Sequence, residues 1–269
     1  LVFFLAVVAT LCVHAGANVL NDVGDDSGGT DRQNDSRIYP YTGGSRFIQT
    51  GIMTAANMTR LGVSLLVIAA ATGLLLIAIK GLTVLWFGLA GVFLAVLYSL
   101  GPLRLSAIGL GELSVGIAFG ILPVVGAAWL QSGTIDQQLV IFSLPVSAWV
   151  TSILLINEVP DVDADGATGK RTLPVRLGLF RTANLYLAIQ LAAAVAVVWL
   201  TYTRALPILA PLVPVGLLLL AIKARSAIRK GLADRAGLTQ AIEATLAIHT
   251  IGSIWLSGVA LYIALWVNP

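Results

Sequence analysis

The chain has 269 residues, of which 58% are hydrophobic and only 11% are charged, and its mean hydropathy is +0.92. Soluble domains carry about 25% charged residues, so this composition excludes an ordinary soluble globular protein. The formal net charge of +3 does not indicate nucleic-acid binding, and the single cysteine, Cys12, excludes an internal disulfide framework.

Continuous apolar runs of about 18 residues or more recur along the chain, and this is the length that a helix needs to cross a bilayer. In lipid every backbone polar group needs a partner within the protein, and continuous rather than alternating runs favour helices over a barrel. The sequence therefore predicts an all-α, polytopic membrane helix bundle. We expect eight spans, at residues 1–21, 61–79, 81–100, 111–131, 138–157, 183–203, 206–222 and 241–267.

The basic residues divide unevenly between the two sides that these spans define. Of the sixteen Lys and Arg residues, only Lys80 and Arg204 fall on one side. The other fourteen lie in segments 22–60, 101–110, 158–182 and 223–240. Because cytoplasmic loops are enriched in Lys and Arg, these four segments are predicted to be cytoplasmic. An even number of spans then puts both termini outside. Since the chain opens within a helix and without Met, we expect an upstream helix to be missing.

Two polar clusters follow spans on the predicted cytoplasmic side. The first has the spacing i, i+3, i+4, i+7, and the second has the spacing i, i+4, i+8, so each cluster lies on one helical face. The first consists of Asn18, Asn21, Asp22 and Asp25, and the second of Asn157, Asp161 and Asp165. Gly28 and Gly29 let the chain turn after the first cluster, and Asp31 follows them.

The chemistry of these clusters favours a magnesium-bound diphosphate. Carboxylates on one face repel one another unless a cation neutralises them, and oxygen ligands without nearby Cys or His suit Mg²⁺. Lys170 and Arg171 come directly after the second cluster and are natural partners for phosphate. The alternative is that the acids are solvated helix caps and turn residues.

These motifs resemble the UbiA superfamily of intramembrane aromatic prenyltransferases. The resemblance is closest to the branch of 1,4-dihydroxy-2-naphthoate polyprenyltransferases of menaquinone synthesis. Five segments carry it, in family order and over most of the chain. They are Asn21-Asp22…Asp25…Gly29-Thr30-Asp31, Gly44 to Gly51, Tyr98 to Glu112, Asn157-Glu158…Asp161…Asp165…Gly169 to Thr172, and Val175 to Gly178.

The resemblance implies a single domain over residues 1–269 with nine spans in the full-length protein, of which this chain lacks the first. It implies Mg²⁺ as cofactor, a polyprenyl diphosphate and an aromatic acceptor as substrates, and a bacterial inner-membrane enzyme whose site faces the cytoplasm. Asn21, Asp25, Asp161 and Asp165 would bind Mg²⁺ and the diphosphate, with the three aspartates catalytic. Supporting ligands would be Asp22 and Asp31, and phosphate contacts would come from Arg104, Lys170 and Arg171. Asp26 departs from the usual aromatic or small residue, which leaves open whether it or Asp25 faces the metal.

Several alternatives remain at the level of sequence. Glu112 and Tyr98 either order the substrate or, in the case of Glu112, cap a helix start. The acceptor could instead be 4-hydroxybenzoate, homogentisate, haem or chlorophyllide. A secondary transporter also places ionisable groups among helices, but such groups lie near the bilayer midplane, whereas these acids lie at the membrane edge.

Overall fold

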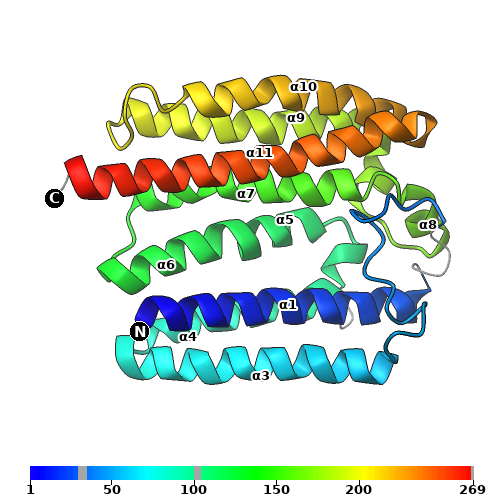
Figure 1. Cartoon of the computed structure of the whole chain (residues 1–269), viewed down its shortest axis with the longest axis horizontal. Coiled ribbons are helices and arrows are strands. Elements are labelled where there is room, and N and C mark those ends of the chain that lie inside the picture. The colour runs from blue at the N-terminus through cyan, green and yellow to red at the C-terminus, as the bar shows by residue number, and fades with distance from the viewer. Residues whose placement is uncertain (30–34, 100–103, 268–269) are drawn as a thin grey trace.

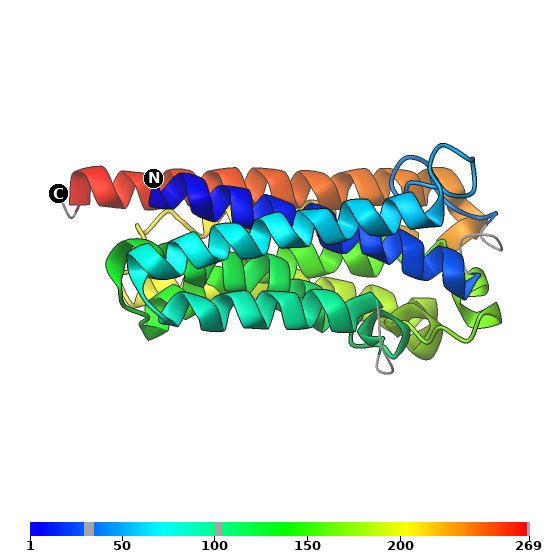
Figure 2. The same cartoon turned by 90° about the horizontal axis from the view of Figure 1, so that it is seen from below.

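The computed structural model describes residues 1–29, 35–99 and 104–267, and all regular elements in these residues are helices. The long helices lie side by side along one axis (Figures 1 and 2). They are α1 (Val2–Gly28), α3 (Ala55–Lys80), α4 (Thr83–Ser99), α7 (Gln137–Asn157), α9 (Leu173–Tyr202), α10 (Leu212–Lys230) and α11 (Arg235–Tyr262). A further rod is built from α5 (Gly111–Gly116), the π-helical turn Ile117–Ile121 and α6 (Leu122–Ser132), and α8 (Val162–Ala167) is short.

The bundle has the composition and lengths of a membrane protein. Six helical stretches of the described residues are long and apolar enough to cross a bilayer. One of them, Leu212–Trp266, takes in both α10 and α11, and the apolar helix Thr83–Tyr98 is shorter than the other spans. The all-α membrane bundle is thus confirmed, while the number of eight spans stays a prediction.

Several helices extend beyond the expected spans, including α9, which begins at Leu173 rather than at residue 183. Two of the changed boundaries have a clear local cause. The first span was expected to end at residue 21, but α1 continues to Gly28 and ends at Gly29, whose φ of 79° is the left-handed conformation that glycine adopts readily. The seventh span was expected at 206–222, but α10 begins at Leu212. Proline cannot donate a hydrogen bond inside a helix, so Pro207 and Pro211 precede this helix instead of lying within it.

The helices form two packed groups. In one, α7, α9, α10 and α11 enclose the main apolar core, which includes Trp149, Tyr186 and Ile242. In the other, α1, α3 and α4 pack together and expose large apolar side chains outward, as lipid contact requires. The α5–α6 rod lies between the groups (Figure 1). A Cβ atom at Gly120 would overlap the backbone of Ser147, so the missing side chain lets this rod approach α7 closely.

The polar ends of the helices lie at one end of the bundle. The end of α1, the short α8, the beginning of α9 and the turn from α10 to α11 all lie at the right in Figure 1, and both labelled termini lie at the left. Lys80 and Arg204 belong to the turns at the left end. The bundle therefore separates the two sets of charged residues that the sequence analysis divided.

Candidate active site

A cavity of about 380 Å³ lies between α1, α4, α5 and α7. Near the polar end of the bundle its walls are carboxylates and amides. Farther along α1 the walls become apolar, with Val13, Phe119 and Ile153. His14 also lines this inner part, and its ring meets that of Phe119 edge to face at 4.7 Å between centroids. The cavity therefore has a charged mouth and an apolar interior.

The helical face of α1 decides which of its acids reach the cavity. Asn21 and Asp25 lie one turn apart, and Asn21 Nδ2 donates to Asp25 Oδ2 at 3.1 Å. Asp26 instead accepts a hydrogen bond from Gln49 Nε2 at 3.3 Å. Asp25 lines the cavity, whereas Asp26 is not among its lining residues.

Asp22 has a second contact besides its place in the cavity wall. Its Oδ2 accepts hydrogen bonds from the backbone N of Ser45 at 3.2 Å and from the Ser45 hydroxyl. These contacts attach the segment after α1 to the cavity mouth, so that Tyr41, Thr42, Gly43 and Gly44 complete the lining. Sequence reasoning did not identify this part of the wall, because neither charge nor spacing marks these residues.

The opposite wall comes from the end of α7 and from α8. Asp161 precedes α8 and its backbone N donates to the carbonyl oxygen of Glu158, while Asp165 lies within α8 and is 1% exposed. Asp165 Oδ2 accepts from the Thr172 hydroxyl at 3.5 Å, but Oδ1 is buried and has no hydrogen-bond donor among the described residues. Burial raises the pKa of Asp165 to about 6, although the ammonium of Lys170 acts in the other direction.

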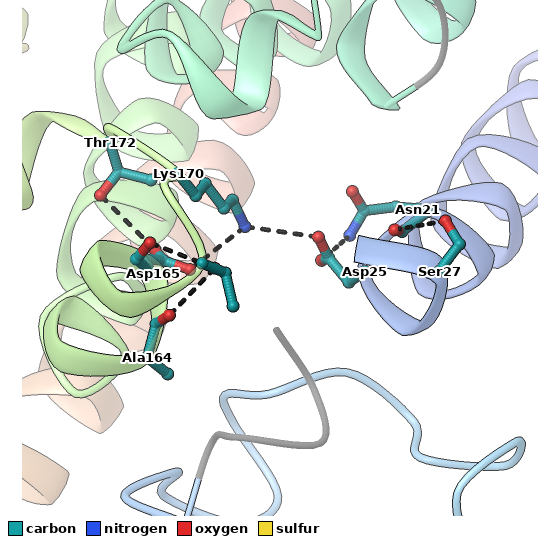
Figure 3. A network of polar contacts seen from close by, with 9 residues as sticks. Asn21, Asp25, Ser27, Ala164, Asp165, Lys170 and Thr172 are labelled. Atoms are coloured by element: carbon teal, nitrogen blue, oxygen red, sulfur yellow. Dashed lines mark hydrogen bonds and ion pairs between the residues drawn. The ribbon is translucent and has the colours of Figure 1, made fainter. Parts of the chain in front are cut away.

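Lys170 joins the two walls (Figure 3). Its Nζ lies 3.5 Å from Asp25 Oδ1 and 3.6 Å from Asp165 Oδ1. Burial by itself would lower the pKa of Lys170, but the carboxylates of Asp25 and Asp165 outweigh it and raise that pKa. A permanently positive group thus lies between carboxylates of two different helices, at the position where a substrate anion and its counter-cations would meet.

A buried carboxyl pair lies behind this mouth. Glu158 lines the cavity and is 7% exposed, and Glu112 is 2% exposed. The Oε2 atoms of Glu112 and Glu158 have no hydrogen-bond partner in the rest of the described chain. A hydrogen bond between these two carboxyls requires that one of them holds a proton. Burial and the adjacent Glu112 raise the pKa of Glu158 well above its usual range.

The other oxygen of Glu112 has a capping role. Oε1 accepts from the backbone N of Leu173 at 3.2 Å, which is the first residue of α9. Glu112 therefore caps a helix start, as one of the two readings of the sequence proposed, but the helix is α9 rather than its own. Tyr98, the second candidate for ordering a substrate, lines the cavity.

The remaining residues of the predicted site lie elsewhere. Arg104 and Arg171 are described but are not part of the cavity lining. The backbone N of Arg171 donates to Ala107 O, which fixes the 104–110 turn beside the segment that carries Lys170. Asp31 lies outside the described residues. Asn21, Asp22, Asp25, Asp161, Asp165 and Lys170 all line the same cavity.

The oxygen-bearing side chains of the cavity would suit a Mg²⁺ ion that is bound partly by the protein and partly by a substrate phosphate. No group of three or more His, Cys, Asp or Glu side chains within residues 1–29, 35–99 and 104–267 is arranged as a metal site by itself. Mg²⁺, however, commonly binds through one or two carboxylates together with substrate phosphates. The buried Oδ1 of Asp165, which lies 3.6 Å from the Lys170 ammonium and has no hydrogen-bond partner among the described residues, has the chemistry that such a ligand would need.

Comparisons with known proteins find relatives that share much of this sequence. A protein from Haemophilus influenzae, named 1,4-dihydroxy-2-naphthoate octaprenyltransferase, is 30% identical over 228 residues, which are 78% of this chain and 72% of that protein. An Escherichia coli protein of the same name is 33% identical over 184 residues, 66% of this chain and 58% of its own length.

The fold has a solved counterpart. The apo structure of a UbiA homologue from Aeropyrum pernix matches 98% of both chains with a TM-score of 0.61 at 17% identity, which supports the fold alone. The model of the UbiA prenyltransferase family matches residues 1–239. With that match and the relatives above, the chain belongs to the UbiA prenyltransferase family and is a prenyltransferase of the membrane.

Proposed function

We propose that this protein transfers a polyprenyl group from a prenyl diphosphate to 1,4-dihydroxy-2-naphthoate, in a Mg²⁺-dependent reaction that releases CO₂ and serves menaquinone synthesis. The observation that carries the proposal is the ion pair of Lys170 with carboxylates from both walls, at the mouth of an apolar cavity. A charged mouth suits a diphosphate, and an apolar interior suits a ring and an isoprenoid chain. The names of the two relatives support the choice of acceptor.

The proposed site consists of three groups of residues. Asp25, Asp161 and Asp165 are the main metal ligands and the catalytic carboxylates, with Asn21, Asp22 and Asp31 as further oxygen ligands. The ammonium of Lys170 lies at the cavity mouth and would donate hydrogen bonds to the diphosphate. Arg104 and Arg171, which do not line the cavity, are proposed as further phosphate contacts. Mg²⁺, when bound, supplies positive charge that stabilises the leaving diphosphate.

The residues of the chain account for the remaining steps. Lys170 donates to the diphosphate as the allylic C–O bond breaks and its electron pair leaves with the phosphate oxygen. The apolar walls at Val13, Phe119 and Ile153 exclude water from the allylic cation. A ring carbon of the acceptor then forms the new carbon–carbon bond. That carbon loses its carboxylate as CO₂, and the electrons of the broken bond return to the ring, so no residue has to remove a ring proton.

The proposed location follows from charge. The four segments rich in Lys and Arg meet at the end of the bundle that carries the cavity mouth, which supports a cytoplasmic site in a bacterial inner membrane.

The test supplies the membrane-embedded protein with a prenyl diphosphate, Mg²⁺ and one of two acceptors. We expect 1,4-dihydroxy-2-naphthoate to be prenylated with release of one CO₂ per product. We expect 4-hydroxybenzoate to react slowly or not at all. Efficient prenylation of 4-hydroxybenzoate with its carboxylate retained, and none of the naphthoate, would overturn the acceptor but keep the family chemistry. If neither acceptor reacts in the presence of Mg²⁺ and prenyl diphosphates of several chain lengths, the proposed reaction is wrong.

A further inference from the structure

Two arginines on α10 share one neutral acceptor on α9. Asn184 Oδ1 accepts from Arg225 Nε at 3.1 Å and Nη2 at 2.7 Å, and also from Arg229 Nη2 at 3.1 Å. Arg229 also lies over the ring of Phe180, with its guanidinium carbon 4.6 Å from the ring centroid. These contacts hold two like charges side by side at a fixed position.

The charge of this pair is not balanced within the described chain. No carboxylate among residues 1–29, 35–99 and 104–267 forms a salt bridge with Arg225 or Arg229. A guanidinium has five N–H donors, so one amide oxygen leaves most of the donors of the pair unused. Two guanidiniums around a neutral oxygen repel each other, and an anion placed against them would remove the repulsion and accept the free N–H groups.

The surface next to the pair is apolar and exposed. On α10, Val215 and Ile222 lie at seven-residue intervals before Arg229, on one helical face, and are 48% and 50% exposed. On α9, Leu191 and Val198 continue from Asn184 at the same interval and are 44% and 47% exposed. α9 and α10 are packed neighbours (Figure 1). Since both stripes start from the contact of Asn184 with Arg229, we place them next to each other along this helix pair.

Arg225 and Arg229 lie near the C-terminal end of α10. α10 ends at the end of the bundle that carries the cavity mouth (Figure 1), Arg229 is in its last turn, and the exposed ring of Phe180 lies against Arg229. Aromatic and basic residues at helix ends are typical of the membrane–water interface, where lipid headgroups lie. The α9–α10 face is separate from the cavity, whose walls come mainly from α1, α4, α5 and α7.

We infer that Asn184, Arg225, Arg229 and Phe180 form a binding site for an anionic phospholipid. The phosphate would take the free N–H groups of the two arginines, and the acyl chains would lie along the two apolar stripes. A free phosphate ion would use the arginines but not the stripes, and a zwitterionic lipid would bring its own cation to a site that already holds two.

The decisive variant is Asn184→Asp. The new carboxylate is nearly isosteric with the amide and would offset one of the two positive charges in place, so the fold is retained while the attraction for an anion is weakened. The measurement compares binding of phosphatidylglycerol and phosphatidylcholine to the detergent-purified protein by native mass spectrometry, with melting temperature as a second readout. Lys223→Gln is the matched control, because Lys223 is an exposed cation on the same helix outside the Asn184 contact.

For the wild type and Lys223→Gln we expect bound phosphatidylglycerol and a rise in melting temperature with this lipid over phosphatidylcholine. In Asn184→Asp the preference should fall about fivefold, since one of the two positive charges near the membrane surface is offset and each is worth about 1 kcal/mol. Arg225→Gln/Arg229→Gln should lose the preference as well. Three results would overturn the inference: an unchanged preference in Asn184→Asp, the same stabilisation by inorganic phosphate as by the lipid, or a change of oligomeric state in Asn184→Asp, which would assign this face to a second copy of the chain.

Discussion

Lys170 Nζ lies 3.5 Å from Asp25 Oδ1, although 145 residues separate the two in the chain. Asp25 belongs to α1, whereas Lys170 follows α8 and precedes α9, so this ion pair joins the two packed groups of helices across the cavity mouth. Asp165 faces the same ammonium from the other wall. The charge of Lys170 therefore compensates carboxylates that would otherwise repel each other in a partly buried site.

Replacing Lys170 by Met should destabilise the protein in the absence of Mg²⁺. The substitution keeps the apolar stem but leaves Asp25 and Asp165 without their cation, and loss of one partner from a buried pair costs on the order of 3 kcal/mol. Melting temperatures would measure this effect, and Mg²⁺ should restore more stability to the variant than to the wild type. Lys230→Met is the control, because Lys230 pairs with Asp234 at an exposed position and should matter little. Equal small effects of both substitutions would argue against the role of Lys170.

Replacing Glu158 by Gln should stabilise the protein at neutral and alkaline pH. Burial and Glu112 raise the pKa of Glu158 in the folded state above its unfolded value, so the folded state holds this proton more tightly. Stability is then lost as the pH rises from the unfolded pKa to the folded one, and Gln removes this loss because it has no proton to release. The gain in melting temperature should be largest near pH 8 and shrink toward pH 5.

The exposed Asp163→Asn, from the same segment, is the control and should show no such dependence on pH. If Glu158→Gln melts below the wild type at every pH, the idea that Glu158 and Glu112 share a proton is wrong.

Gly120→Ala should destabilise the bundle by about 1–3 kcal/mol, since the new methyl group would force α7 and the π-helical turn apart. Thermal unfolding in detergent would measure the change. Gly258 on α11 has open space around it and serves as the matched position, where Ala should be neutral or stabilising. A tolerated Gly120→Ala would show that the close approach of these helices is not required.

Periodicity and charge were enough to predict the helical bundle and to place both acidic clusters at one end. They also identified Lys170, because a basic residue directly after a carboxylate cluster has an evident partner. The pairing of Glu112 with Glu158 could not be predicted, since it depends on how α5 packs against the end of α7. Tyr41 to Gly44 were missed for a similar reason, because a hydrogen bond from Ser45 to Asp22 brings them to the cavity.

The positions of Arg104 and Arg171 show another limit of the sequence. Both are basic residues in segments that resemble the family, yet charge alone does not fix where a side chain points. In the structure Arg171 is part of a backbone contact to Ala107, and neither arginine belongs to the cavity wall. Their phosphate contacts therefore stay predictions, which Arg104→Gln and Arg171→Gln would test through the KM for the prenyl diphosphate.

The topology can be tested by labelling of single cysteines. In a Cys12→Ala background, Asp163→Cys lies at the end of the bundle with the cavity mouth, and Thr134→Cys lies in the turn between α6 and α7 at the opposite end. Both residues are exposed. Intact cells should protect Asp163→Cys from an impermeant maleimide and should expose Thr134→Cys. The reverse pattern would place the site outside and refute the positive-inside assignment.

The dependence of activity on Mg²⁺ should change with pH because of Asp165. Its pKa is raised to about 6, so the carboxyl is ionised above this pH and increasingly neutral below it. Only the ionised form is a good ligand for Mg²⁺, and metal and proton therefore compete for the same oxygens. The Mg²⁺ concentration that gives half-maximal prenyl transfer should be nearly constant between pH 7 and 8, and should rise about tenfold for each unit below about pH 6. Asp165→Asn cannot bind the proton, so whatever activity it retains should lose this component of the pH dependence. A wild-type requirement for Mg²⁺ that is the same at pH 5.5 and pH 7.5 would remove Asp165 from the proposed metal site.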